Sequence, residues 1–173
     1  MNRALRTIRF ISKGGGYLAG VLMVGTAALI FAEIVSRLFF GTSTQVAEEF
    51  SGYALAGMIY LGAAYTLIHQ EHIRVEILRD RLEGDAQVWL ERFALTVGVL
   101  FGAFLTVAFF GLFWDSLTNS TRSFMPSRTP LAIPHGLIFL GSLLLLLQFV
   151  GLLLESWTEQ TPTDAPGESV EGI

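Results

Sequence analysis

Side chains that could carry chemistry in this 173-residue chain are few, and they gather near the ends of apolar segments. Glu33 lies four residues before Arg37, the acid-first order that favours an ion pair on one helix face. Three interpretations stay open for this pair: a local ion pair, a contact with a partner subunit, or a proton site. Glu48 and Glu49 open the next apolar segment, where the unpaired N–H groups of a helix start favour negative charge. Because adjacent helical residues point about 100° apart, one carboxylate can face a partner while the other faces water.

The histidines are the only candidates for a metal or haem site. His69 and His72 stand three residues apart, as a ligand pair can, but no third strong ligand is placed beside them. His135 lies far along the chain, at the opposite membrane boundary in the arrangement derived below. A haem held by two histidines needs them to face each other across a bundle. We therefore predict no metal ion and no cofactor.

Other catalytic signatures do not stand out in the sequence. The chain contains no cysteine, which excludes disulfides, thiolate nucleophiles and cysteine-ligated zinc or iron–sulfur clusters. It shows no Gly-rich phosphate loop, no Ser/His/Asp arrangement with readable spacing and no basic aromatic patch. The net charge of −4 gives no reason to expect a nucleic-acid partner. The sequence therefore predicts a protein that is not an enzyme and does not bind nucleic acid.

The composition indicates that lipid surrounds much of this chain. Hydrophobic residues make up 52% and charged residues only 15%, where soluble domains carry roughly 25% charged residues. The mean hydropathy is +0.56, more apolar than a core of this size can hide. We predict an all-α integral membrane protein, because an open strand in lipid would leave backbone polar groups unpaired.

Four apolar segments are long enough to cross about 30 Å of hydrocarbon, which takes about 20 helical residues. They predict transmembrane helices at about 17–40, 47–68, 89–113 and 133–154, and together a single four-helix membrane domain over residues 17–154. Trp89, Trp114 and Trp157 lie at span boundaries, where indole rings favour the headgroup level. Tryptophan is therefore expected to anchor the helices at the interfaces.

The distribution of Lys and Arg predicts the orientation, since cytoplasmic loops carry the excess. Eight basic residues fall on one side of the four spans: Arg3, Arg6, Arg9, Lys13, Arg74, Arg79, Arg81 and Arg92. Three fall on the other: Arg37, Arg122 and Arg128. Both termini are therefore expected in the cytoplasm. Residues 155–173 contain acids, two prolines and no basic residue, and we expect an acidic disordered tail.

Two further segments have the pattern of amphipathic helices at the membrane surface. Residues 1–16 combine four basic side chains with Leu5, Ile8 and Ile11 at helical spacing, as expected for a segment lying on an anionic leaflet. A secretory signal peptide is the alternative, but the apolar run that follows exceeds 20 residues and shows no convincing cleavage site. Residues 71–85 alternate charges with one apolar face and are expected to lie along the cytoplasmic surface.

The connection between the last two spans, residues 115–134, is polar and carries Pro126, Pro130 and Pro134. The prolines stiffen it and prevent the preceding helix from continuing. Two interpretations remain open. The segment is a rigid connector, or its arginines, Arg122 and Arg128, form a docking surface for an extracytoplasmic protein.

An ordered set of short motifs resembles the Q-type (DctQ-like) small permease subunit of tripartite ATP-independent periplasmic (TRAP) transporters. It comprises the runs SRLFFGTS at 36–43, Glu48-Glu49, YLGAA at 60–64, EHIRVEIL at 71–78, Arg81-Leu82 and RTPLAIP at 128–134. The resemblance covers about residues 10–155. One departure is Glu76, where the family often has Asp; the charge is kept.

The resemblance implies a system of three proteins in a bacterial or archaeal cytoplasmic (inner) membrane. A periplasmic binding protein captures an organic acid, a large permease subunit carries the sodium and substrate sites, and the small subunit accompanies it. We expect this chain to act as a scaffold that braces the large subunit and helps to dock the binding protein. The residues expected at partner interfaces are Arg37, Glu48, Glu49, Gly62, His72, Arg74, Arg122 and Arg128.

Two alternatives from other classes remain. One is a self-contained small exporter that works as a homodimer, which predicts a membrane-central acid. The other is a haem-carrying membrane anchor of an enzyme. The low number of ionisable residues within the spans favours the accessory subunit over the exporter.

Overall fold

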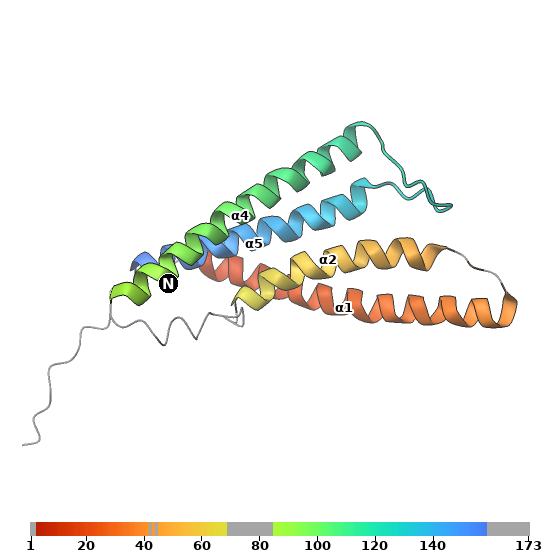
Figure 1. The fold of residues 1–173 in the computed structure, drawn as a ribbon, viewed down its shortest axis with the longest axis horizontal. Coiled ribbons are helices and arrows are strands. Elements are labelled where there is room, and N and C mark those ends of the chain that lie inside the picture. Colours follow the sequence, from red (N-terminus) through yellow and green to blue (C-terminus); the bar gives the residue numbers. More distant parts are fainter. Residues whose placement is uncertain (1–2, 42, 44, 69–84, 159–173) are drawn as a thin grey trace, which may run out of the picture.

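The computed structural model describes residues 3–41, 43, 45–68 and 85–158. Within them it contains four helices, α1 (Arg3–Phe40), α2 (Val46–Ile68), α4 (Asp85–Thr118) and α5 (Ala132–Thr158), and no β-strand (Figure 1). The surface helix expected at 71–85 falls almost wholly outside the described residues, as do His69, His72 and Arg74. The predicted all-helical class is confirmed for the described part of the chain.

Local sequence signals set the helix boundaries. Gly41 follows α1 with φ of +65°, and its N–H donates to the carbonyl of Arg37 at 3.1 Å, as in a left-handed C-terminal cap. Pro134 lies in the first turn of α5, where a missing N–H costs nothing. The first turn of α2 carries Glu48 and Glu49, as the helix dipole favours.

The helices form two antiparallel hairpins, α1 with α2 and α4 with α5, which α2 and α5 join by packing against each other. Figure 1 shows the hairpins close together at the end where α1 begins and α5 ends, and diverging toward the other end. We call these the termini end and the loop end; the connections 41–45 and 119–131 lie at the loop end.

Close approach between α2 and α5 depends on small residues. A Cβ on Gly141 of α5 would lie 2.7 Å from the Cβ of Tyr60 and 3.0 Å from the backbone nitrogen of Leu61. Ala64, Leu67 and Leu145 form the buried cluster between the same two helices. The core of the bundle therefore lies along the contact of α2 with α5.

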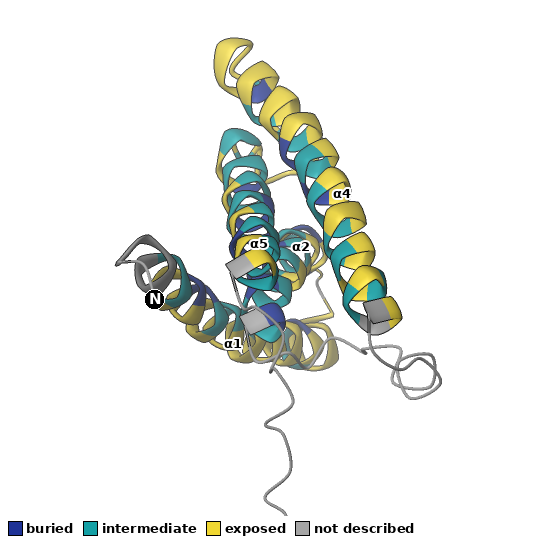
Figure 2. Ribbon diagram, turned by 90° about the vertical axis from the view of Figure 1, so that its left-hand side faces the viewer, coloured by how far each residue is buried: buried dark blue, intermediate teal, exposed yellow. Residues whose placement is uncertain are grey.

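Helices α1 and α4 flank this contact and expose most of their surface (Figure 2). Their exposed side chains include many large apolar ones, such as Phe10, Val24 and Phe31 on α1 and Phe93 and Phe104 on α4. Such a surface cannot face water, so the outer faces of both helices require lipid or another protein.

Three helices are long and apolar enough to cross a membrane: Ile8–Phe40, Val88–Thr118 and Ala132–Trp157. They contain the expected spans at 17–40, 89–113 and 133–154. The expected span at 47–68 is also a helix, α2, but α2 is not among the three. Its first turn carries two glutamates, and the helix is rich in Gly, Ala and Tyr. The four-span count therefore stays a prediction.

Two boundaries differ from those expected. Residues 3–16 do not form a separate helix, because α1 runs without a break from Arg3 to Phe40. The glycines at 14–16 do not interrupt it; Gly15 packs on Leu61 and Gly16 on Tyr65, so this segment belongs to the α1–α2 contact. At the other terminus, α5 continues to Thr158, so the first four residues of the expected tail are helical. Residues 159–173 lie outside the described part.

Candidate partner-binding site at the loop end

An ion-pair network joins α1 to α2 at the loop end. The Nε of Arg37 lies 3.0 Å from Glu33 Oε1, so the expected ion pair along α1 is present. Another guanidinium nitrogen of Arg37 lies 3.0 Å from Glu48 Oε1 in the first turn of α2. Ser43, in the connection, donates a hydrogen bond of 2.8 Å to Glu33. Glu33 is buried while Arg37 is exposed, so the arginine compensates a carboxylate that lies inside the bundle.

The two adjacent glutamates of α2 make different contacts within this chain, because neighbouring helical positions point about 100° apart. Glu48 is exposed and turns to Arg37. Glu49 is buried and accepts a hydrogen bond of 2.9 Å from the Tyr53 hydroxyl. It also accepts a hydrogen bond from the hydroxyl of Ser127, which lies in the connection between α4 and α5. Glu49 therefore fastens that connection to the first turn of α2.

Residues 121–131, which we call the loop hairpin, are held by backbone hydrogen bonds. Arg122 and Pro130 form an isolated antiparallel bridge. The N–H of Ser123 donates to the carbonyl of Thr129 at 2.9 Å, and the N–H of Leu131 donates to the carbonyl of Thr121 at 3.0 Å. The connection between α4 and α5 is thus an ordered hairpin.

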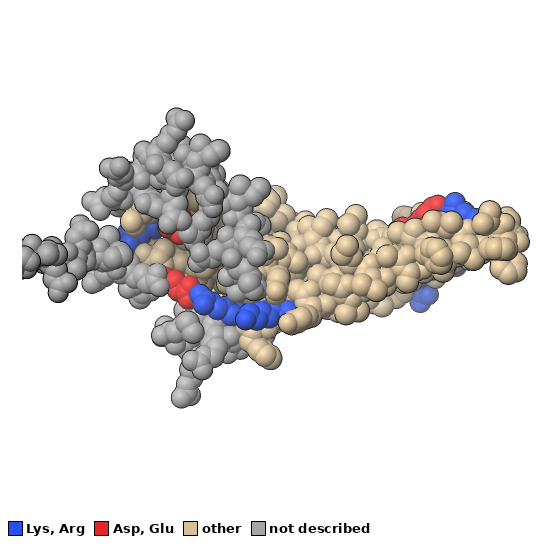
Figure 3. Space-filling view, turned by 90° about the horizontal axis from the view of Figure 1, so that it is seen from below, with Lys and Arg blue, Asp and Glu red and all other residues tan. Residues whose placement is uncertain are grey.

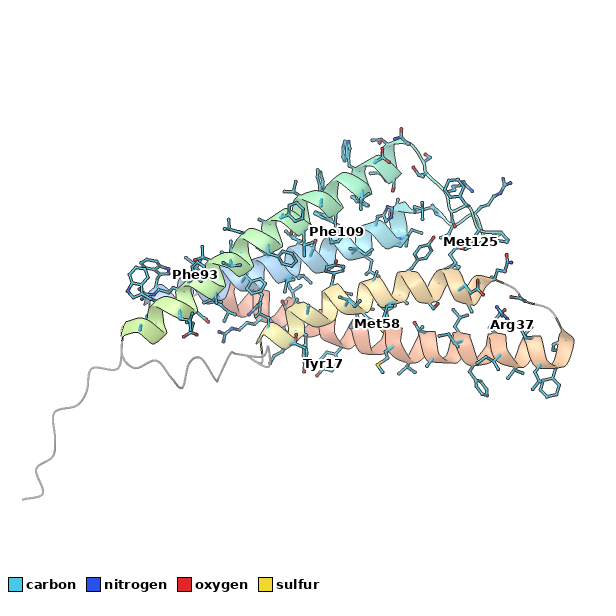
Figure 4. All side chains as sticks on the ribbon, viewed as in Figure 1. Tyr17, Arg37, Met58, Phe93, Phe109 and Met125 are labelled. Atoms are coloured by element: carbon cyan, nitrogen blue, oxygen red, sulfur yellow. The ribbon has the colours of Figure 1, made fainter. Side chains whose placement is uncertain are left out.

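The tip of the loop hairpin exposes both arginines and two apolar side chains. Arg122 and Arg128 are exposed, as is Phe124, and Met125 beside it is partly so. Figure 4 shows Met125 and Arg37 at the same end of the molecule, on the connection and on α1. Arg37, Glu48, Glu49, Arg122 and Arg128, five of the residues expected at interfaces, thus gather at the loop end.

Gly62 lies elsewhere, in the contact between α1 and α2. A Cβ built on it would lie 4.0 Å from the Cβ of Ala19 on α1. Gly57 lies against Leu22 of α1 and Leu137 of α5. The small residues of α2 therefore serve packing inside this chain at these positions.

A second polar cluster, which the sequence did not reveal, lies at the termini end. Arg9 of α1 pairs with Glu155 of α5 at 2.6 Å. Arg92 of α4 donates to the carbonyl of Ser156 at 3.0 Å, and its guanidinium lies 4.5 Å from the ring centre of Trp157. These contacts join residues far apart in sequence, so no spacing rule could have identified them.

Between the two ends, charge is scarce. Figure 3 shows Lys, Arg, Asp and Glu near both ends of one face, with uncharged surface between them. His135 lies at the loop end, where its Nδ1 is 2.7 Å from the Ser116 hydroxyl. Among residues 3–41, 43, 45–68 and 85–158, no three His, Asp or Glu side chains are placed to share a metal ion.

Comparison with known proteins gives two matches. Residues 26–159 match the family model described as "Tripartite ATP-independent periplasmic transporters, DctQ component". The chain is also 24% identical over 135 residues to a Haemophilus influenzae protein named "Putative TRAP transporter small permease protein", covering 78% of this chain and 80% of that protein. No solved structure matches.

Proposed function

Because this chain belongs to the DctQ-component family of TRAP transporters, we propose that it supports sodium-driven uptake of an organic acid by bracing the large permease subunit and helping to dock the binding protein. The observation that carries this proposal is the position of charge. Residues 14–32, 50–68, 93–114 and 136–154 contain no Asp, Glu, Lys, Arg or His. Transporters hold Na⁺ or a carboxylate inside the membrane through ionisable residues or unwound stretches of helix. These segments carry no charge and the four described helices are continuous, so we assign those sites to the large subunit.

All four helices cross the bacterial or archaeal inner membrane in this proposal, with the loop end outside and the termini end in the cytoplasm. Support for the fourth span comes from α2 packing between α1 and α5, which places it inside the bundle. The excess of Lys and Arg near the termini end supports the orientation. Residues 17–154 then act as one membrane domain.

Bracing of the large subunit uses the apolar outer faces of α1 and α4. These faces are not covered by the described residues of this chain, and their side chains suit either lipid or another helix. The two hairpins are joined at one end by the Arg9–Glu155 ion pair and at the other by the hydrogen bond from Ser127 to Glu49. A bundle tied at both ends can resist movement of a neighbouring subunit, as a brace requires.

The loop hairpin supplies the docking surface for the binding protein. It is exposed, it carries Arg122 and Arg128, and it is held to α2 through Glu49. Positive charge on a fixed surface speeds association with a partner of opposite charge. His72 and Arg74 are proposed to meet the large subunit on the cytoplasmic side.

Reconstitution with charge-reversed loops tests the docking role. The double variant Arg122→Glu/Arg128→Glu should lower uptake at limiting binding protein, while the large subunit still copurifies with the chain. A saturating concentration of binding protein should restore most of the uptake rate, because the variant slows only the association of the binding protein with the membrane complex. A matched control is Lys13→Glu, which reverses an exposed charge toward the opposite end of the bundle. Unchanged uptake in the loop variant at limiting binding protein would refute the docking role.

Single cysteines test the four spans and their orientation, since the chain has none of its own. A cysteine at Asn119 should react with a membrane-impermeant thiol reagent in intact spheroplasts. A cysteine at Asn2 should react only after the membrane is opened. Labelling of both positions in intact spheroplasts would contradict the proposed arrangement.

A further inference from the structure

Phe124 is the most exposed large apolar side chain of the described residues, with a relative exposed area of 104%. It stands next to Met125, itself 41% exposed. Single exposed apolar residues are common on proteins. What distinguishes Phe124 is that hydrogen bonds fix the hairpin that carries it, while its own side chain contacts almost nothing else in the chain.

Hydrogen bonds within the loop hairpin fix the segment on both sides of Phe124. Four residues after Phe124, the N–H of Arg128 donates to the carbonyl of Met125 at 3.0 Å and closes a turn over residues 125–128. Arg128 has φ of +46°, and Ser120, just before the hairpin, has φ of +48°. Non-glycine residues rarely adopt this conformation, and they concentrate at functional segments that the surrounding structure holds in place.

The hairpin is also fastened to the bundle. Ser127 donates to the buried carboxylate of Glu49, and Ser127 and Thr129 hydroxyls lie 2.9 Å apart. The tip therefore keeps a fixed position relative to α2. A fixed loop loses little conformational freedom when a partner binds, which strengthens binding without any added contact.

We propose that Phe124 is the apolar anchor by which the loop hairpin binds the soluble binding protein, and that it inserts into an apolar pocket with an acidic rim. This inference rests on the docking role proposed above and adds the residue that holds the complex together. Aromatic residues and arginine dominate the energetic centres of protein interfaces. Arg122 and Arg128 flank Phe124, and residues 119–131 contain no acid, so the partner surface around the pocket must be acidic.

A protein fits the tip better than a membrane surface does. Binding to lipid depends on a broad apolar face, as on an amphipathic helix. The neighbours of Phe124 and Met125 are instead Ser123, Pro126 and Ser127, which leaves only two side chains to enter a bilayer. One aromatic ring in a rigid polar hairpin suits a single complementary pocket.

The experiment uses the complete membrane complex in nanodiscs and the purified, substrate-loaded binding protein of the same transport system. Phe124→Ala should weaken binding about 10-fold or more, mainly by faster dissociation, because it removes an anchor. The charge-reversed arginine variant should mainly slow association. Phe50→Ala is the matched control, because Phe50 is an exposed aromatic of α2 at the same end, and the affinity of this variant for the binding protein should equal that of the wild type.

A fluorophore that reports its surroundings, attached to Met125→Cys beside the intact Phe124, identifies what covers the tip. Its emission should shift to the blue only when the binding protein is added, while the same label on Asn119→Cys should not respond. A label that is already blue-shifted in nanodiscs, and does not change on addition, would show that lipid covers the tip and would overturn the proposal.

If the wild-type complex binds the binding protein and the Phe124→Ala complex binds it with the same affinity, the anchor role of Phe124 is refuted, but the docking role is not. Loss of affinity in the charge-reversed variant would then leave docking by the arginines intact. No binding to the wild-type complex would overturn the docking role and the anchor together.

Discussion

The contact between α2 and α5 at Gly141 allows a direct test of the packing that joins the two hairpins. In Gly141→Ala the new Cβ would lie 2.7 Å from the Cβ of Tyr60 and 3.0 Å from the backbone nitrogen of Leu61. These separations fall 0.4 to 0.7 Å short of the 3.4 Å at which ordinary contact begins. The nearest atoms belong to the backbone or are fixed to it, so no side chain can turn away.

Overpacking of this kind costs about 1–3 kcal/mol of the free energy of unfolding. For a chain of this length that corresponds to a fall in Tm of about 2 to 12 °C. The assay is thermal unfolding of the purified chain in one detergent, followed by tryptophan fluorescence. Gly20→Ala is the control, because no atom lies within 4 Å of a Cβ at Gly20 and alanine favours a helix. Equal Tm values for the two variants would refute the packing argument.

The remaining predictions concern the polar contacts of the bundle and the expected absence of haem. Glu49→Ala should speed hydrogen exchange at the backbone amides of the loop hairpin, because it removes the carboxylate that accepts hydrogen bonds from the Tyr53 and Ser127 hydroxyls. Ser127→Ala should have a smaller effect, and exchange as slow as in the wild type for both variants would contradict the fastening role. Arg9→Glu should lower the free energy of unfolding by only about 0.5–1 kcal/mol, because the ion pair with Glu155 is partly exposed. Adding Glu155→Arg to the same chain restores an ion pair of reversed polarity and should recover part of this loss. If nothing is recovered, the pair itself contributes nothing to stability. The purified chain should show no Soret absorbance, and a stoichiometric haem band would favour the membrane-anchor alternative.

Local patterns in the sequence predict the helices and one ion pair of the site, because both depend on residues within a few positions. The apolar runs locate all four described helices, and the acid-first spacing of Glu33 and Arg37 predicts their contact. The adjacent glutamates predict that two faces of α2 carry charge. They do not predict that Glu49 meets Ser127, because that contact joins positions 78 residues apart.

The shifts of helix boundary at both termini have a common physical cause. A basic amphipathic pattern at 1–16 and an acidic tail from 155 describe each segment alone. In the structure Arg9 and Glu155 meet across 146 residues, and both lie on helices that continue past the expected boundaries. Periodicity shows which face of a helix is polar, but the partner of that face depends on the packing of the whole bundle.

We propose that this chain supports transport without providing the transport pathway. Sodium-driven uptake into proteoliposomes, with labelled substrate and the binding protein, tests it when the two membrane subunits are added separately and together. We expect no uptake above background for this chain alone and full uptake for the pair, with a much lower rate for the large subunit alone. Sodium-dependent uptake by this chain alone would contradict the claim, as would a large subunit that transports equally well without it.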